Sequence, residues 1–246
     1  MHLASTALAD KLALTKLSLE GNSIGSRGLR AISEALMANT ELKEIYLYNN
    51  QIEDDGLDVF GKMIKNKGNL YAIGLEFNKI GAEGASQVLM GIKSLRGLEK
   101  LYLNANDIKA TDQLGTALIE SLSKCESLKE IRLSNNRLGD EGGIPLAKAL
   151  KLNKSIRVCH VSNNKLSADS AKEFAELIKA NQALRDLDLS SNMIIMEELQ
   201  ILADAFKESS LECLNLRNNL ISSEEILAFD SVLAFVANLP KRKFLF

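Results

Sequence analysis

The sequence has few of the residues from which metal and nucleophilic sites are usually built. It contains two histidines and three cysteines in 246 residues, and Cys125, Cys159 and Cys213 are odd in number and far apart. A disulfide framework needs paired cysteines, so these are predicted to be free thiols in a reducing compartment. The sequence therefore favours a cytoplasmic protein, with an effector delivered into a host cytosol as the alternative.

An excess of charge of one sign is also missing. The formal charge is −2, and Lys and Arg are interspersed with Asp and Glu. A surface that neutralises phosphates needs clustered positive charge, so nucleic acid is not an expected partner. The N-terminus lacks the basic region and long apolar run of a signal peptide, and no apolar run approaches the about 18 residues of a membrane span. No membrane partner is predicted.

One pattern recurs eight times, and it organises the chain. It reads apolar, two variable, apolar, one variable, apolar, two variable, Asn, one variable, Ile or Leu, as in LYAIGLEFNKI at 70–80. Successive asparagines are 28, 28, 28, 30, 28, 28 and 27 residues apart. The repeated asparagines are Asn22, Asn50, Asn78, Asn106, Asn136, Asn164, Asn192 and Asn219.

Each repeat is predicted to be a short strand followed by a helix. Alternating apolar residues such as Ile45 and Leu47 place one face of a strand in a core, and apolar pairs such as Phe60 and Ile64 recur at helical spacing in the second half of each repeat. The pattern resembles the leucine-rich-repeat family, and its period near 28 is similar to the ribonuclease-inhibitor-like class. That resemblance implies an α/β solenoid, or horseshoe, with a parallel sheet on the concave face and helices on the convex face.

The recurring asparagine is predicted to be structural. Its amide carries two donors and an acceptor, which can bond the backbone of neighbouring turns where the chain leaves each strand. The eight asparagines should therefore form a ladder along the solenoid.

The whole chain, 1–246, is predicted to be a single leucine-rich-repeat domain. Residues 1–13 align with the helical half of a repeat and have no polar cap before them, so this end either continues a longer array or contacts another surface. The eight strand motifs and their helices occupy 14–221. In 222–246 a capping box, Ser222 with Glu225, begins a helix to about Asn238, and the last residues, KRKFLF, either fold over the last repeat or fray.

Motifs that suggest chemistry are better explained by the fold. Glycines such as Gly21 and Gly25 follow several strands, which favours tight turns over phosphate-binding loops. The acidic groups at 53–55 and 140–141 suit helix starts and offer too few oxygens for calcium. His160 has no second ligand or nucleophile in the pattern. No enzyme, metal or cofactor is predicted, although Cys125 and Cys213 are expected to be the more reactive thiols.

A partner is predicted to bind the concave face, where the variable strand positions lie. The four tyrosines all fall in repeats two to four. Gly74 should leave a depression between the rings of Tyr46 and Tyr102, and Tyr71 and Phe77 should lie at its margins. Tyr and Arg carry much of the energy of protein interfaces. The predicted partner-binding residues are Tyr46, Tyr48, Gly74, Tyr102 and Arg132. A second candidate patch is Met193, Ile195 and Met196.

Two other functions remain open beside a non-catalytic protein-binding scaffold. The repeats are similar to those of the Ran GTPase-activating protein, which implies a regulator of a small GTPase with Arg132 or Arg27 as the contributing residue. The same repeats occur in nucleotide-binding pattern-recognition receptors, which implies a ligand-sensing fragment of a larger receptor or effector. Fold does not choose among these functions.

Overall fold

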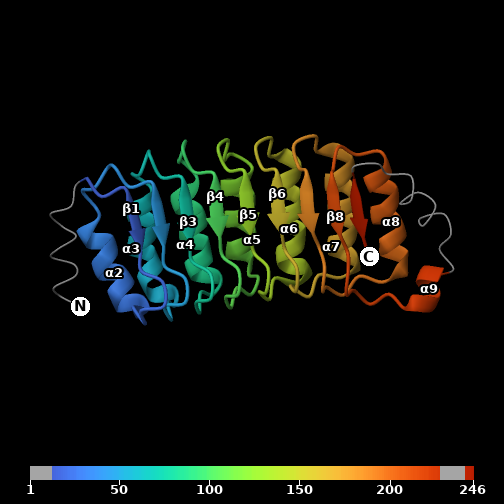
Figure 1. Ribbon diagram of the computed structural model, residues 1–246, viewed down its shortest axis with the longest axis horizontal. Coiled ribbons are helices and arrows are strands. Elements are labelled where there is room, and N and C mark those ends of the chain that lie inside the picture. Colours follow the sequence, from blue (N-terminus) through green and yellow to red (C-terminus); the bar gives the residue numbers. More distant parts are fainter. Residues whose placement is uncertain (1–12, 228–241) are drawn as a thin grey trace.

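The computed structural model describes residues 13–227 and 242–246. Nine short parallel strands form one sheet, and their order in the sheet is their order in the chain. Figure 1 shows the strands side by side along the long axis, with the helices in a second layer behind them. The strands are β1 (Lys16–Ser18), β2 (Glu44–Tyr46), β3 (Ala72–Gly74), β4 (Lys100–Tyr102), β5 (Glu130–Arg132), β6 (Val158–His160), β7 (Asp186–Asp188), β8 (Cys213–Asn215) and β9 (Lys243–Leu245).

A helix follows each strand from β1 to β8. This alternation confirms the α/β solenoid that the repeat predicts, because each strand is backed by its own helix. A 3₁₀ turn, η1 (Asp54–Gly56), leads into the second helix. The helices are α2 (Gly25–Ala35), α3 (Leu57–Ile64), α4 (Ala82–Ile92), α5 (Asp112–Leu122), α6 (Gly139–Leu152), α7 (Ala168–Ala180), α8 (Met196–Lys207) and α9 (Ser223–Leu227).

The core lies between the sheet and the helices. The central residue of each strand points into it, and Ile45, Ile73 and Leu101 are fully buried there. The helices supply large side chains such as Phe60 and Phe174, which are equally buried. The two outer residues of a strand therefore project from the opposite side of the sheet. We call that side the open face, and it is the face predicted to be concave.

The repeated asparagines form a chain of hydrogen bonds at the ends of the strands. The Asn106 amide nitrogen donates to the carbonyls of Leu75 (3.0 Å) and Leu103 (3.1 Å), and its oxygen accepts from the N–H of Ile80 (3.0 Å). Asn50 makes the same kind of contacts: its amide nitrogen donates to the carbonyls of Leu19 and Leu47, and its oxygen accepts from the N–H of Ile24. The interior asparagines are buried, so they bond backbone groups that have no access to water.

A second set of buried polar residues, which the sequence analysis missed, links the opposite edge. Asn153 and Asn181 lie just after helices and donate to carbonyls one repeat earlier, and each accepts the N–H three residues ahead. Lys67 takes the equivalent place in its repeat. Its side chain is fully buried, and Nζ donates to the carbonyls of Leu36 (2.6 Å), Met37 (3.2 Å) and Asn39 at the end of α2.

The C-terminal residues fold over the last repeat, which decides between the two alternatives left open by the sequence. Lys243–Leu245 pair with β8, and the ring centre of Phe244 lies 5.4 Å from that of Phe206. The capping box at Ser222 is present, because the N–H of Glu225 donates to Oγ of Ser222 (3.2 Å). The predicted extension of this helix to Asn238 and the half-repeat at the N-terminus lie outside the described residues, apart from residue 13.

Candidate functional site

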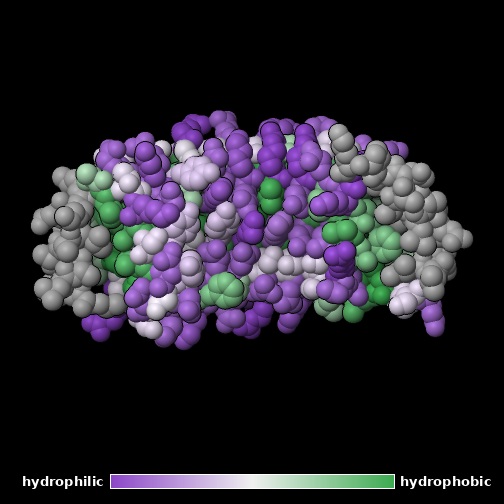
Figure 2. Space-filling view, viewed as in Figure 1, coloured by the Kyte–Doolittle hydropathy of each residue, from purple (hydrophilic) through white to green (hydrophobic). Residues whose placement is uncertain are grey.

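Four of the five predicted binding residues, Tyr46, Gly74, Tyr102 and Arg132, lie in one straight row across the open face. Strand pairing sets Tyr46 directly beside Gly74, Gly74 beside Tyr102, and Tyr102 beside Arg132. Neighbouring strands are about 4.8 Å apart, so side chains from three adjacent strands can contact each other. Figure 2 shows that the surface over the middle strands is mostly hydrophilic, while hydrophobic areas gather toward the two ends of the sheet. The tyrosines therefore stand within a polar surface.

Glu130, on β5, holds two neighbouring side chains of this row, Tyr102 and Arg132. Its Oε2 accepts a hydrogen bond from the Tyr102 hydroxyl (3.2 Å), and its Oε1 accepts one from Nε of Arg132 (2.5 Å). The Arg132 guanidinium carbon also lies 5.4 Å from the centre of the Tyr102 ring, a distance at which a cation is attracted to the ring face. The three side chains thus form one preorganised cluster.

The depression predicted above Gly74 is filled. A Cβ placed on Gly74 would meet Cδ1 of Tyr46 at 2.7 Å and Oε2 of Glu76 at 2.9 Å. The ring and the carboxylate therefore occupy the space that a side chain on this strand would take, and Gly74 is buried. A glycine allows this close approach because it has no Cβ. The prediction of a depression is therefore wrong, because Gly74 gives the space above it to the side chains of Tyr46 and Glu76.

The hydroxyls of the two half-buried tyrosines are held in their neutral form. Burial raises the pKa of Tyr46 to about 12, helped by its hydrogen bond to Glu44. Burial likewise raises the pKa of Tyr102 to about 12, helped by the charge of Glu130. These phenols remain donors over the whole physiological range, which suits recognition rather than proton transfer.

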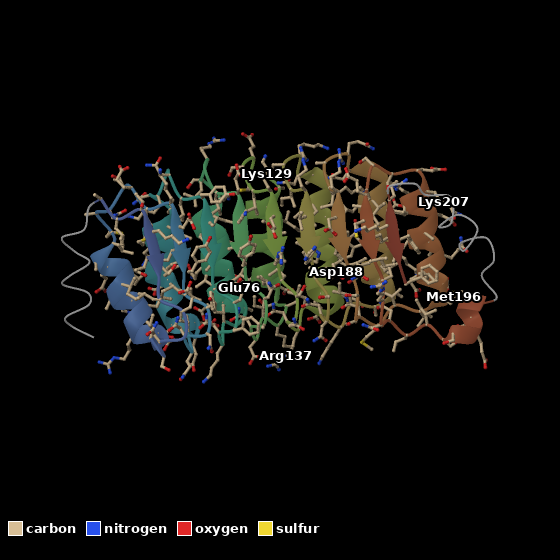
Figure 3. All side chains as sticks on the ribbon, in the orientation of Figure 1. Glu76, Lys129, Arg137, Asp188, Met196 and Lys207 are labelled. Atoms are coloured by element: carbon tan, nitrogen blue, oxygen red, sulfur yellow. The ribbon has the colours of Figure 1, made fainter. Side chains whose placement is uncertain are left out.

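The other predicted residues lie at the edges of this row. Tyr48 follows β2 and has 41% of its surface exposed. Tyr71 precedes β3, with Nζ of Lys100 over its ring at 5.5 Å, and Phe77 is exposed in the turn after the strand. Of the second candidate patch, Met193 and Ile195 are exposed, whereas Met196 packs partly against the core at the start of α8. Met196, labelled in Figure 3, lies toward the C-terminal end of the sheet, whereas the tyrosines lie on or beside β2 to β4.

Of the two cysteines expected to be the more reactive, the expectation is wrong for Cys125. Cys125 is buried and forms part of the core. Cys213 is half-buried on the open face, where burial and the charge of Asp186 raise its pKa to about 11, so it carries little thiolate at neutral pH. Cys159 is fully buried. His160 lies 3.5 Å from Asp186, and the same carboxylate also interacts with the Cys213 side chain on the next strand.

The acidic residues at helix starts bond the next repeat instead of a cation. Asp54 accepts the N–H of Gly81 (2.7 Å), and Asp140 accepts the N–H groups of Ser167 (2.9 Å) and Ser170 (3.2 Å). Within residues 13–227 and 242–246, no three His, Cys, Asp or Glu side chains come together as a metal site. Gly25 has a positive φ of 60°, in agreement with a turn.

The surroundings of the two arginines considered for a GTPase regulator give neither of them a distinctive role. Arg132 is tied to Glu130, and Arg27 is exposed at the start of α2. Among the described helices, none has the length and apolar character needed to cross a bilayer.

Comparison with known proteins identifies the repeat. The Leucine Rich repeat family matches residues 13–33 and 124–147. The mouse Ribonuclease inhibitor is 27% identical over 137 residues, which is 55% of this chain and 30% of the inhibitor. The Protein phosphatase 1 regulatory subunit 37 homolog of Caenorhabditis elegans is 31% identical over 116 residues, 44% of this chain and 12% of that protein. Mouse NACHT, LRR and PYD domains-containing protein 5 is 29% identical over 143 residues, 57% and 12% respectively. The chain therefore corresponds to a minor part of each of these relatives.

Proposed function

Because this chain is a leucine-rich-repeat protein of the ribonuclease-inhibitor-like type, we propose that it is a non-catalytic scaffold that binds a protein partner on its open face. The observation that supports the proposal best is the row of Tyr46, Gly74, Tyr102 and Arg132 in register on the four adjacent strands β2 to β5, with Tyr48 directly after β2. Two relatives are named as an inhibitor of ribonuclease and a regulatory subunit of a phosphatase, and both names describe action on another protein.

The physical case rests on rigidity and on the type of side chain. Tyrosines offer a large contact area with few rotatable bonds, so ordering them on binding costs little entropy. Here the hydrogen bond to Glu130 orders Tyr102, and packing against Gly74 orders Tyr46, before any partner binds. The mixed charges around the rings supply the polar rim that protein interfaces usually have.

The test compares capture of proteins from a cell lysate by wild type and by a Tyr46→Ala/Tyr102→Ala variant. We expect the variant to lose at least about tenfold in affinity for the captured partner, the range found for central aromatic residues. Tyr48→Ala should weaken binding with a smaller effect on folding, since its ring is exposed. The matched control is Met90→Ala/Ile119→Ala, which removes two exposed apolar side chains from α4 and α5 on the helix side. Equal capture by wild type and the tyrosine variant, with the same unfolding midpoint, would contradict the proposal.

The GTPase-regulator function, the receptor fragment and the cytoplasmic location stay predictions. A GTP hydrolysis assay with the captured partner tests the first of them. The possible contact through the N-terminal end falls on residues outside the described part of the chain.

A further inference from the structure

One carboxylate oxygen on the open face is buried without a hydrogen-bond partner. Oε2 of Glu76, in the turn just after β3, is inaccessible to water and accepts no hydrogen bond (Figure 3). It is the one carboxylate oxygen in this state among the described residues. An ionised group removed from water is costly to the folded chain unless an opposite charge or a donor meets it.

Neighbouring acidic side chains of the same face are paired within the chain. Glu44 meets Lys16 at 3.0 Å, and Glu130 meets both Arg132 and Tyr102. Carboxylates on β7 are also engaged, since Asp186 lies 3.5 Å from His160. Glu76 differs because the residues beside it in the sheet offer no cation.

Tyrosine side chains lie near this carboxylate, and the ring of Tyr46 is next to it. Oε2 of Glu76 and Cδ1 of Tyr46 both lie within 2.9 Å of the point where Gly74 would carry its Cβ, so the carboxylate and the ring are next to each other. Tyr102 stands on the other side of Gly74, and the exposed Tyr48 follows on the adjacent strand. Burial raises the pKa of Glu76, and its own backbone N–H and the charge of Arg132 only partly oppose that shift.

We propose that Glu76, with Tyr46, Tyr48 and Tyr102, receives a basic side chain, arginine or lysine, from the protein partner. The inference rests on the proposed function and specifies the chemistry of the partner. A carboxylate beside ring faces attracts a cation by charge and by cation–π contact. An apolar or acidic group closing over the same place would bury the carboxylate further without compensation.

The chain already uses this chemistry on the rings nearby. Nζ of Lys16 lies 5.1 Å from the centre of the Tyr46 ring, and Arg132 and Lys100 approach Tyr102 and Tyr71 in the same way. The tyrosines of this face are therefore presented in orientations that a cation can meet. Arg132 pairs with Glu130, with its Nε 2.5 Å from Oε1 of Glu130, and its charge offsets the burial of Glu76 only in part.

Glu76→Gln separates a binding role from a structural one. The pKa of Glu76 is raised in the folded state, so the folded chain binds more protons than the unfolded chain between the two pKa values. The contribution of this carboxyl to stability is therefore lost as the pH rises through that window. At neutral pH the neutral amide should therefore leave the unfolding midpoint unchanged or higher. A clear loss of stability in Glu76→Gln would show that the carboxylate supports the fold, and the inference would fail.

Binding is measured with small probes on the full chain. The four tyrosines are replaced by 3-fluorotyrosine and followed by ¹⁹F NMR, with assignment by single Tyr→Phe variants. The probes are arginine amide and lysine amide with blocked amino ends, and the neutral control is the corresponding citrulline amide, all at millimolar concentration. We expect saturating shifts of Tyr46, Tyr48 and Tyr102 with at least one basic probe, little change at Tyr71, and no saturation with citrulline.

The variants decide the outcome. Glu76→Gln should weaken the probe by about tenfold or more, because truncating one member of a charge pair at an interface costs on that scale. Glu20→Gln, at the same repeat position on the first strand, should bind as wild type does. Equal binding by Glu76→Gln, or equal shifts with citrulline, would overturn the inference. If Glu76→Gln also captures the partner like wild type while the tyrosine variant does not, the proposed function stands and the role of Glu76 falls.

Discussion

Replacing one interior ladder asparagine tests whether these residues hold the repeats together. Asn106 is 8% exposed, and alanine in its place removes three donated hydrogen bonds and one accepted one. The carbonyls of Leu75 and Leu103 each keep a bond from another ladder asparagine, Asn78 and Asn136 respectively. The N–H of Ile80 loses its acceptor, so the variant contains one buried unpaired donor.

The unpaired N–H of Ile80 sets the size of the expected loss in stability. An unsatisfied buried polar group costs about 1–3 kcal/mol, so Asn106→Ala should lower the free energy of unfolding by about that amount. The measurement is urea denaturation followed by circular dichroism, with the slope of the transition compared between proteins. An unchanged slope is needed because a solenoid can lose cooperativity when one interior repeat is weakened.

The first asparagine of the ladder provides the control. Asn22 is exposed, and its amide donates to the carbonyl of Glu20 in its own turn (2.8 Å). Asn22→Ala should change stability by no more than about 0.5 kcal/mol, the usual range for surface substitutions. If Asn106→Ala is as stable as wild type, or if both variants lose the same amount, the ladder does not act through buried backbone groups.

Two further substitutions probe the contacts between repeats. Lys67→Met keeps the length of a fully buried side chain but removes its bonds to the carbonyls just after α2. The free energy of unfolding, measured by urea denaturation, should therefore fall by about 1–3 kcal/mol. Equal stability would mean that water or neighbouring groups replace Nζ. Asp140→Ala should cost about 1 kcal/mol at neutral pH after allowance for its partial exposure. Burial acts to raise the pKa of Asp140, but hydrogen bonds from Ser167 and Ser170 outweigh it and lower the pKa, so the stabilisation is present above the ordinary aspartate value of 3.8 and is lost as the pH falls. The difference from wild type should shrink in acid, whereas the exposed Glu141→Ala should show little difference at any pH.

The repeat made the fold predictable because its apolar positions are fixed by burial. An alternating pattern leaves a strand with one buried face, and eight copies at a constant spacing leave few other ways to cover those faces. The last strand was harder, because KRKFLF contains too little of the pattern. What orders it is the unpaired edge of β8, which accepts another strand, and the core contact of Phe244 with Phe206. An arginine directly before the strand, as at Arg157 and Arg185, is a signal that could have indicated it.

Several buried residues outside the strand motif were not predicted from the sequence. Asn39, Asn153 and Asn181 recur three residues before the first apolar residue of a motif, so the second set of linking residues was visible in the repeat. Lys67 was not, because nothing in its own sequence distinguishes a lysine that reaches a helix end from one in solvent. Cys125 was misjudged for a related reason: a position near a loop was taken as exposed, whereas the turn there packs into the core.

The open face could be predicted as a set of positions but not as a set of contacts. Which residues share a row follows from the register, but where each side chain lies depends on its neighbour one repeat away. Gly74 lets Tyr46 and Glu76 lean over it, and no pattern within a single repeat contains that information. Side chains of this surface such as Glu44 and Glu130 are paired within the chain, whereas Oε2 of Glu76 is buried without a donor. An interface that supplies the missing charge would gain affinity without losing any existing contact. If the proposed function is correct, we expect a partner to gain most from binding at this aromatic cluster.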